Sequence, residues 1–404
     1  MECRITSRNV NAIAPGPWLR LTALAASAAT LLAVVSGTTG LDTAHRLLAA
    51  LAVPPLVALV ASAWLSYRPL LPFALAALLS FGVAGLATEE IAHIAAAAFA
   101  FSALAVLSAQ AFRGERAPRA NWPDYIALTK PRIMSLLLLT GFSGLVVGAR
   151  GLPAWWITVV AMVGLALACG GASALNHVLD RDIDRLMGER TRARPVAAQR
   201  IPPSHALEFG LALSAFSFVL LASAVNVLTA ALALVGNLFY VLVYTRVLKR
   251  WTPQNIVIGG AAGAVPPLVG YAAATGNLAL PALWLFLIVF FWTPPHFWAL
   301  AILLKENYAA ARVPMLPVVR GVRATTGQIV LYSVVLVGLT AAPFLAGTFG
   351  PAYLAAAFAL GGLFLALAVQ LRRATTPRRA ALLFHYSLLY LALLFVAMAL
   401  DVAV

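Results

Sequence analysis

Long apolar runs separated by short polar connections recur along the whole chain. Each run spans about 17–25 residues, the length that an α-helix needs to cross the hydrocarbon core of a bilayer. The pattern therefore predicts an all-α, polytopic membrane protein with about 13 transmembrane helices surrounded by lipid. The predicted helices begin near Trp18, Arg46, Leu70, Ile91, Ile133, Trp155, Ala206, Leu228, Ile256, Pro281, Gly327, Ala352 and Ala380.

A polar, proline-containing linker, Arg113–Asn121, divides these runs into a block of four and a block of nine. We therefore expect two domains with a boundary near residue 115: a four-helix membrane domain over residues 1–115 and a nine-helix domain over residues 116–404. The apolar run that begins after Arg20 is long, so we interpret it as an uncleaved first helix rather than as a signal peptide.

Basic residues are distributed unevenly between the two ends of the predicted helices. The formal net charge is +15, although only 10% of the residues are charged and 62% are hydrophobic. With the N-terminus placed in the cytoplasm, all of the 28 Lys and Arg except Arg46 and Arg150 fall on the cytoplasmic side. The positive-inside rule predicts this asymmetry. The charge thus indicates topology rather than nucleic-acid binding, and it predicts a multi-pass protein of the cell membrane.

The segment Asn176–Asp184 concentrates an amide and three carboxylates in this apolar chain. Asn176, Asp180 and Asp184 follow one another at every fourth position, so on a helix they lie on one face. Oxygen ligands in this arrangement suit Mg²⁺. Asp182 lies on the opposite face and is expected to pair with an arginine. The alternative interpretation is a helix end whose acids only pair with neighbouring arginines.

Arginines follow the acidic segment closely. Guanidinium groups bind phosphate oxygens, and Mg²⁺ usually keeps substrate phosphate oxygens in its coordination shell. Acids that hold a metal, followed by arginines that hold phosphate, indicate a diphosphate substrate at a membrane surface. For Arg190, Arg194 and Arg200, positive-inside anchoring explains the charge equally well. The whole set is Arg185, Arg190, Arg192, Arg194 and Arg200.

Four longer segments carry a resemblance to a known family. In chain order they are YIALTKPRIMSLLLLTGFSG, ALNHVLDRDIDRLMGERTRARP, YTRVLKRWTPQNIVIGGAAGAVPPLVGY and FFWTPPHFWALAILLKENYAAARVPMLPVV. The block that holds them resembles the UbiA superfamily of intramembrane prenyltransferases, and within it the protoheme IX farnesyltransferases. The resemblance implies nine transmembrane helices, Mg²⁺ as cofactor and farnesyl transfer from farnesyl diphosphate to a vinyl group of haem b, which forms haem O. Two alternatives are prenylation of a quinone precursor and a non-catalytic haem carrier.

The resemblance also implies roles for single residues. Asn176, Asp180 and Asp184 match the family's first metal motif, and Lys130 and Arg132 join them in the expected catalytic set. Lys130 and Arg132 also suit simple positive-inside anchoring. The expected substrate-binding residues are Arg190, Arg194, Tyr244, Lys249, Arg250, Asn255, His296, Lys305 and Tyr308.

Two further features concern the last third of the chain. We expect Pro294 and Pro295 to break the tenth helix and to expose His296 to haem; the alternative is that His296 is a structural hydrogen-bond donor. In the last cytoplasmic loop the family has an acid before its tyrosine, whereas this chain has Asn307. The neighbouring Glu306 is therefore only a weak candidate ligand for a second metal ion.

The first block contains two histidines, His45 and His93, at similar predicted depth in the membrane. Imidazoles from two helices can ligate a haem iron from both sides, and Arg46 can pair with a haem propionate. The segment VVSGTTGLDTAHRLLAALA resembles half of the haem A synthase family, with Asp42 in place of that family's Glu. We expect haem b binding here, and haem A synthase or oxidase assembly factors as partners. The alternative is that both histidines form interhelical hydrogen bonds.

Overall fold

The computed structural model describes residues 17–38, 42–66, 71–86, 100–101, 103–104 and 122–403. The chain divides into two compact units, Met1–Ala120 and Asn121–Val404. The boundary that the sequence predicts near residue 115 lies outside the described residues.

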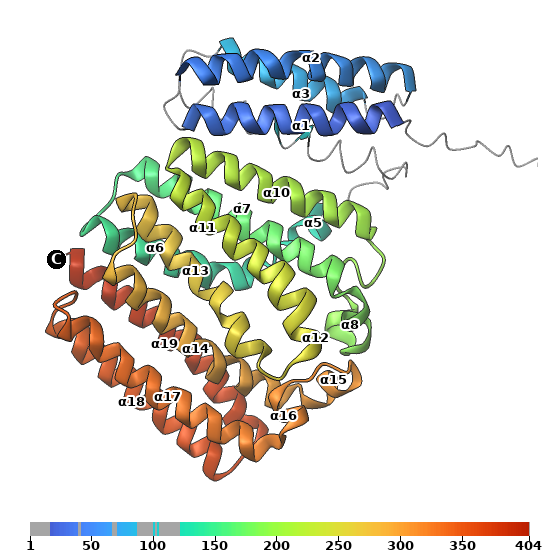
Figure 1. Cartoon of the computed structure of the whole chain (residues 1–404). Helices are drawn as coiled ribbons and strands as arrows, with labels where there is room; N and C mark the ends of the chain where they lie inside the picture. The colour runs from blue at the N-terminus through green and yellow to red at the C-terminus, as the bar shows by residue number, and fades with distance from the viewer. Residues whose placement is uncertain are drawn as a thin grey trace, which may run out of the picture. The chain divides into compact units, whose positions relative to one another are not determined.

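The first unit contains α1 (Pro17–Thr38), α2 (Asp42–Ser66) and α3 (Leu71–Leu86), which lie side by side (Figure 1). Leu19 of α1 packs with Leu56 and Leu59 of α2 in a buried cluster that is otherwise rich in alanine. Small side chains let helix backbones approach closely, as is typical of helices that pack within a membrane. The fourth predicted helix, near Ile91, begins outside the described residues.

The second unit is built from helices in its described part, residues 122–403. Nine helical runs there are long and apolar enough to cross a membrane, which confirms the nine helices predicted after the linker. They are α6 (Pro131–Ala149), α7 (Trp155–Leu179), α10 (Pro203–Ala224), the run Val227–Trp251, α13 (Asn255–Thr275), α14 (Leu280–Leu303), α17 (Gly321–Leu345), α18 (Pro351–Arg373) and α19 (Pro377–Ala403).

Short helices connect the long ones. The run Val227–Trp251 itself comprises α11 (Val227–Leu238), a π-helical segment η2 (Phe239–Leu248) and α12 (Lys249–Trp251). The connecting helices are α5 (Trp122–Leu128), α8 (Arg181–Leu186), α9 (Glu189–Arg192), α15 (Lys305–Ala310) and α16 (Leu316–Val319).

Helices α6 and α13 approach each other closely because glycines face the partner backbone. A Cβ atom on Gly144 would overlap the carbonyl of Pro267, and a Cβ atom on Gly270 would overlap the carbonyl of Gly141. Glycine therefore sets the distance between these two helices, and any larger residue would push them apart.

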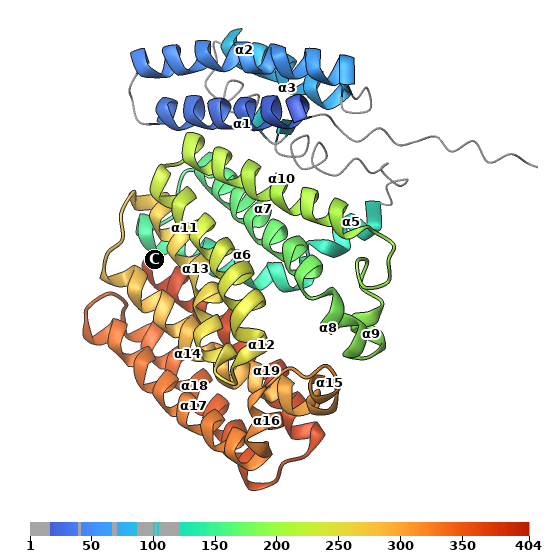
Figure 2. The same cartoon turned by 45° about the vertical axis from the view of Figure 1, so that its right-hand side comes forward.

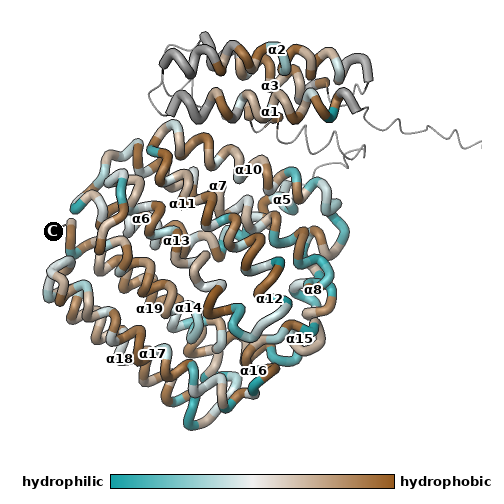
Figure 3. The backbone as a smooth tube through the Cα atoms, in the orientation of Figure 1, coloured by the Kyte–Doolittle hydropathy of each residue, from teal (hydrophilic) through white to brown (hydrophobic). Residues whose placement is uncertain are grey.

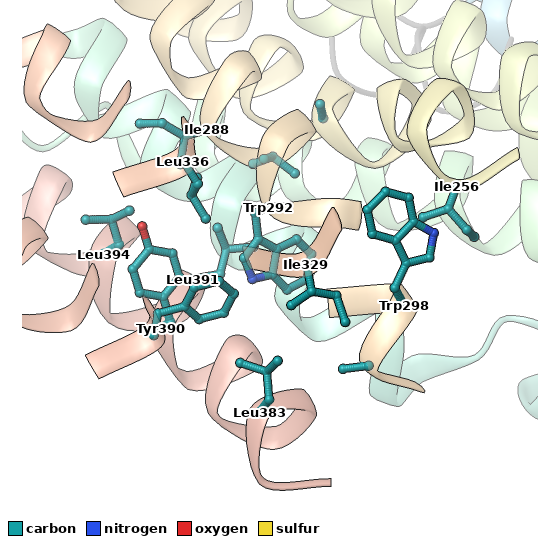
Figure 4. Packing of buried hydrophobic residues seen from close by; sticks show 14 of the residues in the cluster. Ile256, Ile288, Trp292, Trp298, Ile329, Leu336, Leu383, Tyr390, Leu391 and Leu394 are labelled. Atoms are coloured by element: carbon teal, nitrogen blue, oxygen red, sulfur yellow. The ribbon is translucent and has the colours of Figure 1, made fainter. Parts of the chain in front are cut away.

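The largest buried cluster lies around α14, which packs against α13, α17 and α19. Figure 4 shows Trp292 and Trp298 of α14 beside Ile329 of α17 and Tyr390 of α19. Trp298, Ile329 and Tyr390 are no more than 2% exposed, so large rings fill this interface. The packed aromatic rings stabilise the middle of the helix bundle. Polar residues gather at one end of the bundle.

The predicted break in the tenth helix is wrong. Helix α14 continues from Leu280 to Leu303 with Pro294 and Pro295 inside it. Two prolines remove two backbone N–H groups, but neighbouring helices stabilise such a segment in a membrane protein. Most of the apolar part of α14 is buried between its neighbours, and these contacts maintain the helix.

Hydrophilic residues gather where the short helices α8 and α15 connect the long ones (Figure 3). In Figure 2, α8, α9, α12 and α15 lie toward the same side of the second unit. Several predicted site residues belong to these segments or to the adjoining ends of α6, α7 and η2.

Candidate active site

Asn176 joins three segments of the chain within one polar cluster. Its Oδ1 accepts a hydrogen bond from Lys130 Nζ (2.8 Å), which lies just before α6. Its Nδ2 donates to Asp180 Oδ2 (2.8 Å) and to Thr245 Oγ1 (3.1 Å). Because lysine can only donate, Oδ1 is the atom that must face Lys130. Asn176 is only 3% exposed, so these contacts are made in the interior.

Asp180 immediately follows α7 and is 1% exposed. Its Oδ2 pairs with Lys249 Nζ at 2.5 Å, and Lys249 is itself buried. Its Oδ1 is buried and has no hydrogen-bond partner. A buried carboxylate oxygen without a partner is costly, and a cation would satisfy it.

Asp184, on α8, repeats this arrangement. Its Oδ1 pairs with the guanidinium of Arg194 at 2.6 Å, and its Oδ2 is buried without a hydrogen-bond partner. Burial raises the pKa of the Asp184 carboxyl, and the nearby Arg194 offsets only part of that increase. The carboxylate therefore gains from a further positive charge close to Oδ2.

Asp182 lies on the other side of the segment, as the spacing predicts, and its expected pairing with an arginine is confirmed. The two carboxylate oxygens accept hydrogen bonds from the two terminal nitrogens of Arg250, both at 2.7 Å. This pair lowers the pKa of Asp182 to about 2. Arg250 also donates to the carbonyl of Leu179 at 2.7 Å, so it braces the junction between α7 and α8.

Lys130 enters the cluster from a strained backbone position. Its φ is 51°, in the left-handed region, which costs a residue other than glycine on the order of 1–2 kcal/mol. The preceding turn is held by Ser173 Oγ, which donates to the carbonyl of Leu128 at 2.6 Å. Burial, together with the nearby cations Arg194 and Lys249, lowers the pKa of the Lys130 ammonium to about 7.

The segment η2 contributes aromatic and hydroxyl groups to the cluster. Thr245, which contacts Asn176, donates through Oγ1 to the carbonyl of Tyr240 at 2.9 Å. Tyr240 and Tyr244 stack with ring centroids 5.5 Å apart, and Asp180 exerts an electrostatic influence on both. The expected residue Tyr244 thus lies close to the acids. Tyr240 was not predicted, although aromatic residues four positions apart on a helix signal such a pair.

The loop on α15 brings one predicted residue to the acids. Tyr308 is buried, and it lies close enough to Arg194 and Asp180 for their charges to affect its pKa. Burial raises this pKa to about 12. Lys305 is half-buried and Glu306 is exposed, and neither forms an ion pair among the described residues.

Four other predicted residues lie outside the central contacts. Arg132 and Arg190 are exposed and make no ion pair in the described part of the chain. Asn255 is fully buried at the start of α13, where Nδ2 donates to the carbonyl of Thr252 at 2.6 Å and Oδ1 has no partner. Arg200 pairs with Asp124 of α5 at 2.9 Å instead of facing the acids.

His296 is buried in an aromatic stack on α14. Its ring lies between Trp292 and Phe384, with centroid distances of 4.3 and 4.9 Å, and its Nδ1 lies 2.6 Å from Ser387 Oγ. Ser387 Oγ donates its single hydrogen to the carbonyl of Phe384 at 2.6 Å. Nδ1 therefore carries the hydrogen that Ser387 accepts, and Nε2 is the unprotonated acceptor.

His177 is a further residue that the predicted set omits. It is 2% exposed, and neither ring nitrogen has a hydrogen-bond partner. Lys130, Arg194 and Lys249 all exert an electrostatic influence on it, so it lies close to the cations of the cluster. Its position next to Asn176 is the only sequence signal that points to it.

The donors of the cluster fit a magnesium ion. The described residues contain no group of three or more His, Cys, Asp or Glu that could hold a metal, so a site here rests on two carboxylates and an amide. Asp180 Oδ1 and Asp184 Oδ2 are both buried and unpartnered, and both are hard oxygen donors. Mg²⁺ commonly takes one or two carboxylates and completes its shell with water and substrate phosphate.

The structure does not describe the side chains of the predicted haem ligands in the first unit. His93 lies outside the described residues. His45 and Arg46 belong to the first turns of α2, and their side chains also lie outside the described part.

The described residues contain nine helices that are long and apolar enough to cross a membrane, and buried acids and cations lie at the ends of α6, α7 and η2. Such a cluster at the end of membrane helices is suited to binding an anionic group. The chain belongs to the UbiA prenyltransferase family, whose model matches residues 137–397.

Several relatives are about half identical to this chain over the matched region. A protoheme IX farnesyltransferase of Symbiobacterium thermophilum is 55% identical over 281 residues, which are 69% of this chain and 94% of the relative. Relatives with the same name from Roseiflexus castenholzii and Thermus thermophilus are 53% and 50% identical over 70% of this chain. The matched part is only 52% and 47% of those two proteins, so both contain much further sequence.

Solved structures show the same fold. A digeranylgeranylglyceryl phosphate synthase structure matches with a TM-score of 0.59 at 18% identity, over 70% of this chain and 98% of that one. A UbiA homologue from Archaeoglobus fulgidus bound to DMAPP and Mg²⁺ matches with a TM-score of 0.55 at 19% identity, over 69% of this chain and 99% of that one.

Proposed function

We propose that this protein transfers a farnesyl group from farnesyl diphosphate to a vinyl group of haem b and so forms haem O. The observation that carries the proposal is the 55% identity with the Symbiobacterium protoheme IX farnesyltransferase across 94% of that protein. The buried acid and cation cluster supplies the chemistry that such a transfer requires.

The cluster is suited to a magnesium diphosphate. Lys130, Lys249 and Arg194 provide three cationic side chains against the two carboxylates Asp180 and Asp184. Lys130 takes up a proton when diphosphate binds, so the cluster then carries more positive than negative side chains, and the free oxygens of the two carboxylates would hold a metal ion on the diphosphate. Asn176 fixes Lys130 and Asp180 relative to each other, so it serves as a metal ligand or as the support of one.

In the proposed reaction the allylic carbon–oxygen bond of farnesyl diphosphate breaks, and diphosphate leaves with the electron pair. Mg²⁺ neutralises the charge on the leaving group when it is bound. Lys130, Lys249 and Arg194 stabilise the same charge through their N–H groups. The stacked rings of Tyr240 and Tyr244 offer π faces to the allylic cation.

The vinyl group of haem b then attacks C1 of the farnesyl cation. The resulting carbocation beside the porphyrin takes up water and releases a proton, which gives the hydroxyethylfarnesyl side chain. The net reaction consumes haem b, farnesyl diphosphate and water and yields haem O and diphosphate. Burial of the site protects the first cation from bulk water until the vinyl group has reacted.

We infer that His296 contacts haem through Nε2. Ser387 fixes the tautomer in which Nε2 is an unprotonated acceptor, and the rings of Trp292 and Phe384 fix the plane of the imidazole. Histidines that ligate a metal generally donate through the other ring nitrogen, as His296 does to Ser387. Arg190, Arg250, Asn255 and Lys305 complete the proposed substrate-binding set, and Arg132 stays in the proposed catalytic set.

We propose that residues 1–115 bind haem b through His45, His93 and Arg46, on the strength of the resemblance to half of a haem A synthase. Haem A synthase and oxidase assembly factors are the partners that this assignment implies. The distribution of Lys and Arg supports a protein of the cell membrane with the acid cluster on the cytoplasmic side.

The test is the haem content of membranes from a host that lacks its own haem O and haem A synthases. Expression of this chain is expected to produce haem O, identified by chromatography and mass, and Asp180→Asn is expected to abolish it. Haem b alone with the intact chain would contradict the proposal and favour a quinone precursor as acceptor or a haem carrier. Haem A in addition would show that the first unit oxidises haem O.

A further inference from the structure

Asn307 connects two loops of the active-site end that are far apart in the sequence. Its Nδ2 donates to the carbonyl of Met187 at 2.7 Å. Met187 immediately follows α8, the helix that carries Asp184, whereas Asn307 lies on α15, beside Tyr308. The contact joins the segment that holds the acids to the loop that follows α14.

The two loops meet closely at this point. The next residue, Gly188, has φ of +102°, a conformation that side chains other than glycine rarely adopt. A Cβ atom on Gly188 would come within 2.5 Å of Asn307 Nδ2. The backbone of the α8–α9 connection is therefore shaped to receive the amide of Asn307.

The hydrogen bond requires a donor at position 307. The Met187 carbonyl can only accept, so an ionised carboxylate at 307 would leave it unpaired and would also repel it. Position 307 thus differs in kind from Asp180 and Asp184, each of which has a free buried carboxylate oxygen.

The contact lies next to groups of the proposed diphosphate site. Tyr308 follows Asn307 and is buried within the electrostatic range of Arg194 and Asp180. Arg194 in turn pairs with Asp184. Loss of the contact would therefore let Tyr308 shift relative to Asp180 and Arg194 without removing any residue that is proposed to hold the metal or the diphosphate.

We propose that Asn307 is a positioning residue of the farnesyl transfer site, which acts by donating its amide hydrogen to Met187 and so holds Tyr308 against the acid cluster. This inference rests on the proposed function for its kinetic consequence, but its structural part does not. The side chain acts as a neutral donor and not as a metal ligand.

The test compares Asn307→Asp with Asn307→Gln, which keeps the amide, and with Glu189→Gln as an exposed control next to Gly188. Hydrogen exchange of residues 185–194 and 305–312 is measured in nanodiscs without substrate. The Michaelis constant for farnesyl diphosphate, kcat and the Mg²⁺ requirement are measured with haem b. Asn307→Asp is expected to speed exchange in both segments and to raise the Michaelis constant about tenfold at nearly unchanged kcat and Mg²⁺ requirement. Asn307→Gln should keep the Michaelis constant for farnesyl diphosphate close to that of the unchanged chain.

A lower Mg²⁺ requirement or higher activity in Asn307→Asp would overturn the inference, because position 307 would then serve as a metal ligand. Unchanged exchange in both segments would overturn it as well. If the unchanged chain does not transfer farnesyl, the proposed function is wrong. Because hydrogen exchange is measured without substrate, the exchange result still decides this inference in that case.

Discussion

Lys249 and Asp180 form a buried ion pair with 2.5 Å between Nζ and Oδ2, although they come from the ends of different membrane helices. Lys249 follows η2 and Asp180 follows α7, so the pair ties these two helices together at the polar end. The second oxygen of Asp180 is buried and has no hydrogen-bond partner. One carboxylate can therefore hold a structural cation and a catalytic metal ion at the same time.

The first prediction concerns the cost of breaking this pair. Lys249→Met leaves the buried carboxylate of Asp180 without its cation, and we expect the free energy of unfolding to fall by about 3 kcal/mol. Lys249→Arg keeps the charge and should lose far less. The double variant Asp180→Asn with Lys249→Met removes both charges and should be more stable than Lys249→Met alone. The free energy of unfolding is measured by denaturant unfolding in micelles for both single variants and the double variant. If the losses of the two single variants add up to the loss of the double variant, the two groups do not interact.

The second prediction concerns pH. The pKa of Lys130 is about 7 in the structure, so the group is largely neutral at pH 8. Bound diphosphate favours the charged form and raises this pKa, so binding takes up a proton between the two pKa values. The affinity for magnesium diphosphate should therefore fall as pH rises from 7 to 9. The affinity of the Lys130→Arg variant should fall less, and the difference should reach up to about tenfold per pH unit. The titration of diphosphate itself is common to both proteins. Parallel pH profiles in calorimetry would contradict this prediction.

The third prediction concerns the contact of α6 with α13. Gly270→Ala places a methyl group against the carbonyl of Gly141, and we expect it to destabilise the protein by about 1–3 kcal/mol. Gly263→Ala is the matched control on the same helix, because a Cβ atom there meets nothing within 4 Å. The control should be neutral or slightly stabilising, since alanine favours helix more than glycine does. Equal thermal stability of the two variants would refute the close-packing argument.

The fourth prediction concerns the end of α15. The N–H of Val313 donates to the carbonyl of Tyr308, and Arg312 has φ of 54°, which is the arrangement of a helix end that favours glycine. Arg312→Gly should relieve this strain and raise the free energy of unfolding by about 1 kcal/mol. Arg320→Gly, at φ of −109°, is the matched control and should not stabilise. A greater increase in the free energy of unfolding for Arg320→Gly than for Arg312→Gly would show that the backbone at Arg312 is not strained.

Much of the fold follows from the sequence because hydrophobic length determines it. Of the nine membrane-length helices described in residues 122–403, eight begin within three residues of the predicted position. The exception is α17, which begins at Gly321 where Gly327 was expected. The pairing of Asp182 with arginine also follows from helical spacing. The continuity of α14 through Pro294 and Pro295 does not, because contacts with neighbouring helices override the local preference of proline.

The site residues were predictable as residue types and not as contacts. The spacing of Asn176, Asp180 and Asp184 indicates a shared helix face. Which basic side chain pairs with each carboxylate depends on tertiary structure. The π-helical turn that brings Thr245 to Asn176 departs from ordinary helical periodicity, so no pattern of spacing indicates it. The contact of Asn307 with Met187 joins segments 120 residues apart and is likewise visible only in three dimensions.

The most direct test of the account is a single-turnover assay with the purified chain, haem b, farnesyl diphosphate and Mg²⁺. The account predicts that haem O and diphosphate form in equal amounts, and that removal of Mg²⁺ or the change Asp180→Asn abolishes both. Haem b that remains unchanged with the intact chain, farnesyl diphosphate and Mg²⁺ present would contradict it.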